Sequence, residues 1–271
     1  MELDDIARRG LLLLGCGKMG SAMLAGWLSR GFPPEAVWVQ EPQPSDWLSR
    51  QGVRLNEAPA APPAVALVAV KPQMMTDALP SLADFGDGET LFVSVAAGTP
   101  ISFFESALGA RTPVVRAMPN TPAAVGRGVT AIVANAAAGA AALDRAEALL
   151  SAVGKVVRLE SEAQMDAVTA VSGSGPAYVF HLIEALAAAG EAEGLSPDLA
   201  MELAKATVAG AGALAEASEE APDQLRRNVT SPGGTTEAGL SVLMDEESGL
   251  APLLRRTVAA AARRSRELRD G

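Results

Sequence analysis

The chain is poor in the residues that build disulfides and metal sites. Its 271 residues include one cysteine, Cys16, and one histidine, His181. A single cysteine cannot form an intrachain disulfide, and these two side chains are too few for a structural zinc site. The sequence therefore predicts a protein without a bound metal, in a reducing compartment such as the cytoplasm. A Ser-His-Asp hydrolase would have to use His181, for which we expect a structural role.

Aromatic side chains and positive charge are also scarce. Aromatics make up 4% of the residues although 49% are hydrophobic, so the core must pack mostly small side chains on closely spaced helices. The 22 Lys and Arg residues against 32 Asp and Glu give a net charge of -10. That sign disfavours phosphate backbones and anionic lipid surfaces, and we find no run of apolar residues long enough to cross a bilayer. We expect a small-molecule substrate and neither a nucleic-acid nor a membrane partner.

The segment before Cys16 has a superficial likeness to a lipoprotein export signal. Arg8 and Arg9 precede an apolar run at residues 11–14, and the cysteine follows. The run has four residues, whereas an export signal needs about 7 to 15. Acidic residues at positions 2, 4 and 5 also counter the positive charge with which an export signal begins. We therefore interpret the apolar run as a strand.

Two halves of the chain have different patterns. Short aliphatic runs alternate with helical stretches in the first half, as in a parallel sheet covered on both faces; the predicted strands are residues 11–14, 37–39, 65–70, 91–95, 114–117, 129–133 and 156–159. The second half has long alanine-rich stretches at residues 165–171, 176–193, 197–216, 237–247 and 251–269. We predict an α/β protein with a Rossmann-like doubly wound sheet in residues 1–162, followed by an all-helical domain in residues 163–271.

A glycine-rich turn follows the first predicted strand. It consists of Gly15, Cys16, Gly17, Lys18, Met19 and Gly20, and a helical pattern comes directly after it. In that context the glycines permit a tight turn and close approach of a pyrophosphate, which meets the positive end of the helix. Glu41 ends the second strand, where an acid that binds ribose hydroxyls is expected. The turn predicts dinucleotide binding, with Cys16 as a packing residue.

Glu41 also bears on the choice between NADH and NADPH. A carboxylate can accept both hydroxyl protons of an unmodified ribose, whereas it would repel a 2′-phosphate. We expect either cofactor to bind and NADH to be preferred. Ser45 and Arg50, which follow closely, could shift the preference.

Three more loops follow predicted strands at the edge where open α/β sheets bind ligands. Small residues and prolines in these loops favour a flat backbone platform for a nicotinamide ring. The expected cofactor contacts are Val70, Lys71 and Pro72 in the first loop, Ala96 and Ala97 in the second, and Asn120 in the third.

Two segments of the helical half are too rich in glycine and proline to be helical, residues 171–178 and 228–236. The second leads into a helix that we expect to begin near Thr236. Backbone N–H groups of Gly233, Gly234 and Thr235 at such a helix start, beside Ser231, suit a carboxylate as well as a phosphate. We therefore expect a substrate carboxylate to bind at this loop.

These motifs together resemble the pyrroline-5-carboxylate reductase family along nearly the full chain. The similar stretches are GCGKMG at 15–20, AVKP at 69–72, SVAAG at 94–98, RAMPNTP at 116–122, DAVTAVSGSGPAYVF at 166–180 and LRRNVTSPGGTTEAGL at 225–240. The resemblance implies NAD(P)H-dependent reduction of 1-pyrroline-5-carboxylate to L-proline. It also implies an interlocked homodimer, often assembled further, that holds substrate between its helical domains.

The resemblance also implies roles for individual residues. Glu219, Thr235 and Thr236 would contact the substrate, and Asn228 and Asn56 would contact the dinucleotide. An imine nitrogen that arrives protonated needs only a hydrogen-bond partner, and Thr236 can be that partner and hence the catalytic residue. Holding the two reactants together can contribute roughly 7 to 11 kcal/mol.

Two alternatives stay open. A β-hydroxyacid dehydrogenase shares the glycine turn and a helical second domain, and Lys205 is the only lysine that could serve as its base there. A dinucleotide sensor without hydride transfer would need no anion loop. Loss of NADH absorbance on adding the imine distinguishes a reductase from a sensor.

Overall fold

The computed structural model describes residues 2–270 of the chain. They form two compact units: unit 1 comprises the chain up to Gly173 and from Ala261 onward, and unit 2 comprises Ser174–Ala260. The predicted domain boundary at residue 162 stays a prediction.

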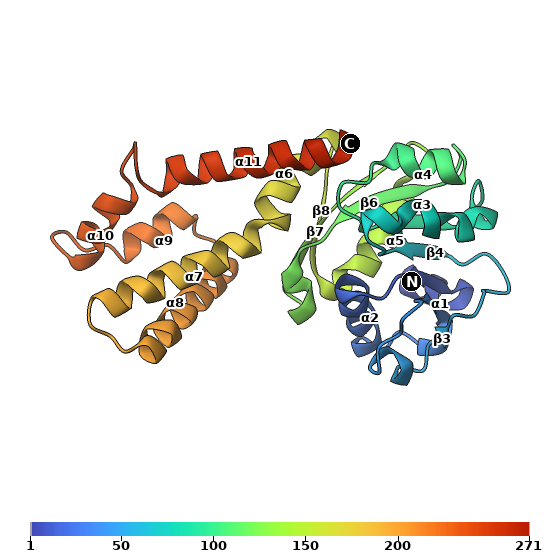
Figure 1. Cartoon of the computed structure of the whole chain (residues 1–271), viewed down its shortest axis with the longest axis horizontal. Coiled ribbons are helices and arrows are strands. Elements are labelled where there is room, and N and C mark those ends of the chain that lie inside the picture. Colours follow the sequence, from blue (N-terminus) through green and yellow to red (C-terminus); the bar gives the residue numbers. More distant parts are fainter. Residues whose placement is uncertain (1, 271) are drawn as a thin grey trace. The chain divides into compact units, whose positions relative to one another are not determined.

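Unit 1 is an α/β fold with a central sheet of eight strands in the described residues (Figure 1). Its strands are β1 Leu11–Leu14, β2 Val37–Gln40, β3 Arg54–Leu55, β4 Val65–Val68, β5 Leu91–Ser94, β6 Val114–Met118, β7 Gly128–Ala134 and β8 Gly154–Arg158. Its helices are α1 Glu2–Arg9, α2 Lys18–Ser29, α3 Met75–Ala78, α4 Ile101–Leu108, α5 Ala140–Leu150 and α6 Met165–Val168. The expected Rossmann-like fold is confirmed.

The strand order is β3-β2-β1-β4-β5-β6-β7-β8. Successive strands are added in one direction from β1 to β3 and in the opposite direction from β4 onward, so the strand order reverses between β1 and β4. Doubly wound sheets bind ligands at such a switch point. Strands β1 to β6 are parallel to one another, whereas β7 is antiparallel to β6 and β8 is parallel to β7. The expectation of a parallel sheet is therefore wrong at β7 and β8. The connection from β6 to β7 holds only the 3-10 turn Thr121–Val125, which is too short for a helical crossover.

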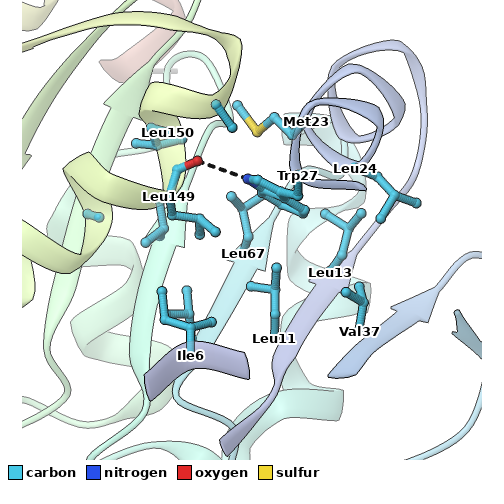
Figure 2. Close-up of a cluster of buried hydrophobic side chains, with 14 of the residues drawn as sticks. Ile6, Leu11, Leu13, Met23, Leu24, Trp27, Val37, Leu67, Leu149 and Leu150 are labelled. Atoms are coloured by element: carbon cyan, nitrogen blue, oxygen red, sulfur yellow. Dashed lines mark hydrogen bonds between the residues drawn. The ribbon is translucent and has the colours of Figure 1, made fainter. Parts of the chain in front are cut away.

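The sheet is buried on both faces because alternate residues of its strands point to opposite sides. In β1, Leu11 and Leu13 belong to one apolar core, and Leu12 and Leu14 belong to the other. Figure 2 shows the first core, where the Trp27 Nε1 of α2 donates to the Leu149 carbonyl of α5 at 2.9 Å. Since Leu149 and Trp27 lie far apart in the sequence, this bond fixes the helix that follows the glycine turn.

Unit 2 is helical, as predicted. Its helices are α7 Gly175–Ala192, α8 Pro197–Ala217, α9 Pro222–Asn228 and α10 Thr235–Leu243, and α11 Leu250–Asp270 runs from unit 2 into unit 1. Helices α7 and α8 form an antiparallel pair around three buried alanines, Ala187, Ala200 and Ala204. Many large apolar side chains of these helices are exposed, among them Phe180, Leu182, Leu186, Leu199, Leu203 and Leu214. The small core therefore leaves an apolar surface uncovered within one chain.

Several local features differ from the sequence-based expectations. Helix α1, the short strand β3 and helix α9 were not expected, and α10 begins at Thr235 and ends at Leu243 instead of spanning 237–247. The expected helix at 165–171 is α6 followed by a π-helical turn at Thr169–Gly173. Glycines at positions 173 and 175 weaken the regular helical pattern there.

Candidate active site

The turn after β1 is built from glycines for three separate reasons. Gly15 has φ +88, which side chains rarely adopt, and its N–H donates to the Gln40 carbonyl at 2.9 Å. A Cβ on Gly20 would lie 2.5 Å from the Gly15 carbonyl oxygen, so α2 can pack on the turn only with glycine there. A Cβ on Gly17 would meet no atom within 4 Å. The turn is thus closely packed at Gly15 and Gly20 and open at Gly17, where the first amides of α2 can meet a pyrophosphate.

The remaining residues of the turn are divided between surface and core. Lys18 is exposed at the first position of α2, Met19 is half-buried and Cys16 is buried. Burial raises the pKa of the Cys16 thiol above its ordinary value of 9.0, the nearby Ser21 hydroxyl lowers it, and the Glu41 charge raises it. The Ser21 hydroxyl also donates to the Cys16 carbonyl at 2.8 Å. A neutral, buried thiol fits packing and not reactivity.

Glu41 lies directly after β2 and is joined to the glycine turn. Its Oε2 accepts from the Cys16 N–H at 2.8 Å, and its Oε1 accepts from the Gln43 N–H at 3.1 Å. Each oxygen keeps a lone pair that a ribose hydroxyl can use. The carboxylate therefore lies beside the turn, as a ribose ligand must, and its orientation is fixed before any ligand binds.

Asn56 holds Glu41 from the other side. Its Oδ1 accepts from the Glu41 N–H at 2.9 Å, and its Nδ2 donates to the Glu41 carbonyl at 3.0 Å. Asn56 itself has φ +56, a conformation that asparagine tolerates better than most residues. The amide group that was expected to contact a dinucleotide is thus bonded to the backbone of Glu41.

The loops after β4 and β5 lie at the same edge of the sheet as the glycine turn, because β1, β4 and β5 are adjacent and parallel. Val70 contacts the turn: a Cβ on Gly15 would lie 2.9 Å from its Cγ1. Lys71 and Pro72 are exposed at the start of a 3-10 turn. In the β5 loop, Ala96 is buried and Ala97 is exposed. The structure brings these predicted cofactor residues together with the turn.

Asn120 follows β6 and is bonded to protein groups. Its Oδ1 accepts from the Val129 N–H at 2.9 Å, and its Nδ2 donates to the Ser172 carbonyl at 3.3 Å. These bonds join the end of β6 to the start of β7 and to the π-helical turn. Asn120 thus fixes the loop, and the Ser172 contact was not foreseen although Ser172 lies in the quoted 166–180 stretch.

The predicted substrate loop lies in unit 2. Gly233 has φ +69, and Thr235 and Thr236 are exposed in the first turn of α10. The Gly233 N–H donates to Glu237 Oε2 at 2.7 Å, and the Gly234 N–H donates to the Ser231 carbonyl at 3.0 Å. Two of the three amides expected to face an anion therefore have partners within the loop. The signal for Glu237 was an acid in the first helical turn, which often bonds the amides before it.

The other predicted ligands of unit 2 lie around α9. Glu219 is exposed just before this helix. Asn228, at the end of α9, donates from Nδ2 to Glu220 Oε2 at 2.9 Å and accepts at Oδ1 from Gln224 Nε2 at 2.7 Å. The role of Glu220 was not foreseen, because nothing in the sequence indicates that α9 returns Asn228 to the segment that precedes it.

The residues of the alternative readings are exposed side chains. Lys205 is exposed on α8. His181 lies exposed on α7, where its Nδ1 is 3.1 Å from Glu184 Oε2. No group of three His, Cys, Asp or Glu side chains in residues 2–270 could hold a metal ion. Within the same residues, no helix is both long and apolar enough to span a membrane.

Comparison with known proteins connects these features to one family. Residues 162–268 match the family model described as pyrroline-5-carboxylate reductase dimerisation, and residues 11–98 match that of NADP oxidoreductase, coenzyme F420-dependent. The pyrroline-5-carboxylate reductase of Pseudomonas aeruginosa is 41% identical, over 96% of this chain and 97% of its own length. That of Synechocystis is 43% identical, over 94% and 97%.

The chain is a member of the pyrroline-5-carboxylate reductase family.

Solved structures of the family have the same fold. The Coxiella burnetii enzyme superposes with a TM-score of 0.91 at 35% identity, covering 96% of this chain and 98% of that one. The Plasmodium falciparum enzyme, described with NADP bound, has a TM-score of 0.82 at 28% identity with the same coverage. The dimerisation match contains the helices α7 and α8 that expose apolar side chains. The family match thus supports a homo-oligomer.

Proposed function

We infer that the chain reduces 1-pyrroline-5-carboxylate to L-proline with a hydride from NADH or NADPH, the last step of proline biosynthesis. Its family membership carries this conclusion, and the glycine turn at the β1 and β4 switch point agrees with it. The open space above Gly17 and the glycine required at position 20 fit a dinucleotide pyrophosphate. When bound, the nicotinamide supplies the hydride.

We propose that Thr236 acts at the imine nitrogen. Its hydroxyl can bond an imine that arrives already protonated, so no strong acid is required of the chain. Thr235 and the first-turn amides of α10 would bind the substrate carboxylate, since these amides precede any carbonyl partner within the helix. The Gly233 and Gly234 amides would then shape the loop, and Glu219 would bond the product amine.

We further propose that some of the predicted dinucleotide residues contact the cofactor and that others hold those residues in place. Glu41 would accept the ribose hydroxyls, while Asn56 fixes Glu41 and Asn120 fixes the β6 loop. The backbone at Val70, Lys71, Pro72, Ala96 and Ala97 would face the nicotinamide half, and Asn228 would also contact the dinucleotide. Because Glu41 is held as a carboxylate beside the turn, we expect NADH to be preferred.

The assembly we propose is a homodimer that is the building block of larger homo-oligomers, with substrate held between the helical domains of its subunits. The exposed apolar side chains of α7 and α8 support a dimer built through these helices. We propose a domain boundary near residue 162, and the start of the dimerisation match at that residue supports it. A cytoplasmic location agrees with the single cysteine, since no intrachain disulfide is required.

Turnover with both cofactors tests the proposal. Purified chain should consume NADH absorbance when 1-pyrroline-5-carboxylate is added, and proline should form in equal amount. A sensor would show a cofactor-induced rise in melting temperature without turnover, and that result would contradict the proposal. A β-hydroxyacid dehydrogenase would lose its activity in Lys205→Met, whereas we expect that variant to reduce the imine at the normal rate.

A further inference from the structure

One part of the 166–180 stretch has no role in the reaction described above. Asp166, which begins it, lies in α6 and is 5% exposed. Its Oδ1 accepts from the Ser265 hydroxyl at 2.7 Å, and its Oδ2 accepts from Arg269 Nη1 at 2.6 Å. Both partners lie in the last two turns of α11, about a hundred residues further along the chain. The buried Asp166 carboxylate thus connects the last two turns of α11 to α6.

The turn of α11 that Asp166 holds lies next to Gly98 in the loop after β5. Gly98 has φ +76, and a Cβ built on it would lie 3.6 Å from the Leu268 carbonyl oxygen and 3.9 Å from the Leu268 Cβ. Leu268 is the residue next to Arg269. A side chain of a single carbon at position 98 would thus be in van der Waals contact with the turn that the Asp166 ion pair fixes, so Gly98 lies next to that turn.

The other end of the same loop is held from the segment just before α6. Glu162 Oε1 accepts from the Ile101 N–H at 2.9 Å, at the start of α4. The same oxygen accepts from the buried Arg116 of β6 at 2.6 Å. The loop between β5 and α4 is thus held at its end by Glu162 and backed at Gly98 by the last turn of α11.

We propose that Asp166 and Arg269 are positioning residues for the dinucleotide. By holding the last turn of α11 against Gly98, they keep the backbone of loop 96–98 in the shape that meets the nicotinamide half. Helix ends fray when nothing ties them down, so without the ion pair this turn would leave the loop unsupported. The inference rests on the proposed placement of loop 96–98 in the cofactor site.

Dinucleotide affinity in Arg269→Ala tests this inference. The Kd for NADPH and NADH should rise about 10-fold, from loss of a charged hydrogen-bonded contact, while the KM for the imine changes less than about 2-fold. Arg269→Lys keeps the positive charge and should recover most of the affinity. Arg264→Ala is the matched control, since Arg264 pairs with Glu267 on the exposed side of the same helix, 2.9 Å away. It should bind cofactor like the unmodified chain.

Two further variants separate positioning from stability and from the underlying placement. Ile6→Ala removes a fully buried core side chain of α1, which leads into the amino end of β1 and so lies away from the cofactor loops, and it should lower the melting temperature without raising the cofactor Kd. An equal rise in Kd there would reduce Arg269 to a stabilising residue and overturn the inference. Ala97→Leu should weaken cofactor binding directly. If it does while Arg269→Ala does not, the positioning role alone is wrong; if Ala97→Leu has no effect, the placement of the loop and the inference both fail.

Discussion

The glycine turn of unit 1 and the loop at residues 231–236 of unit 2 both lead into a helix N-terminus, but they are held in different ways. The turn is fixed by distant parts of the chain: Gln40, Glu41 and Val70 all contact it. In the loop of unit 2, by contrast, the N–H groups of Gly233 and Gly234 donate to Glu237 and Ser231, which are close neighbours in the sequence. We therefore expect the turn to receive a dinucleotide in the shape it already has, and the substrate site to be completed by the partner subunit.

The largest effect that this comparison predicts is at the turn itself. A Cβ at Gly20 would meet the Gly15 carbonyl oxygen at 2.5 Å, so Gly20→Ala must move α2 away from the turn. We expect cofactor affinity to fall by about 100-fold or more, corresponding to roughly 3 kcal/mol, together with a lower melting temperature. Titration of NADH fluorescence and a melting curve measure the two effects.

Gly17→Ala separates folding from binding at the same turn. Its Cβ would meet no protein atom within 4 Å, so the melting temperature should stay unchanged while cofactor affinity falls. Unchanged affinity in Gly17→Ala would mean that no pyrophosphate approaches this backbone, and the proposal that the glycine turn binds the dinucleotide would be wrong.

The next effect concerns the loop of unit 2. Thr236→Ala removes one hydroxyl from an exposed position, so the fold should be unaffected. We expect kcat to fall by an amount that corresponds to a rise of about 1 to 3 kcal/mol in the activation free energy, with the Kd for NADH nearly unchanged. Thr236→Ser, which keeps the hydroxyl, is the matched control and should retain most of the rate. Turnover at the normal rate in Thr236→Ala would refute its role at the imine.

The same contrast explains how much could be predicted from the sequence. The glycine turn is a local pattern next to a strand, and the position of Glu41 follows from the spacing of parallel strands, so both were predictable. The antiparallel β7 was not, because an aliphatic run does not indicate strand direction. The bonds of Asn56, Asn120 and Asn228 were also missed. Each amide can bond ligand or backbone, and only the folded chain decides between them.

The substrate loop shows a further limit of the sequence pattern. Glycines at a helix start predict free amides, but they do not show which acceptors the chain supplies nearby. Glu237 lies in the first turn of α10 and takes the Gly233 N–H, and Ser231 takes that of Gly234. The pattern located the loop correctly in sequence, and its substrate role stays a prediction.

A smaller effect should follow from Glu41→Ser. The change removes a negative charge that would repel a 2′-phosphate, and it leaves a hydroxyl that can donate to one. We expect the ratio of kcat/KM for NADPH over that for NADH to rise by about 10-fold, or roughly 1.4 kcal/mol. Glu35→Ser, an exposed acid before β2, is the matched control for lost charge. An unchanged ratio in Glu41→Ser would show that the carboxylate does not select the cofactor.

The smallest effect should be at Cys16, which is buried in the turn and whose N–H donates to Glu41 Oε2 at 2.8 Å. Burial raises the pKa of this thiol above 9.0 in the folded chain, so the folded state holds its proton to higher pH than the unfolded state does. This contribution to stability is fully present below the unfolded pKa and is lost as the pH rises from there through the folded pKa. Iodoacetamide should therefore label the folded chain more slowly than the urea-unfolded chain between pH 7 and 10, and saturating NADH should slow labelling further. Equal rates in the folded and unfolded chains would mean that the turn opens readily, and the contrast between the two sites would disappear.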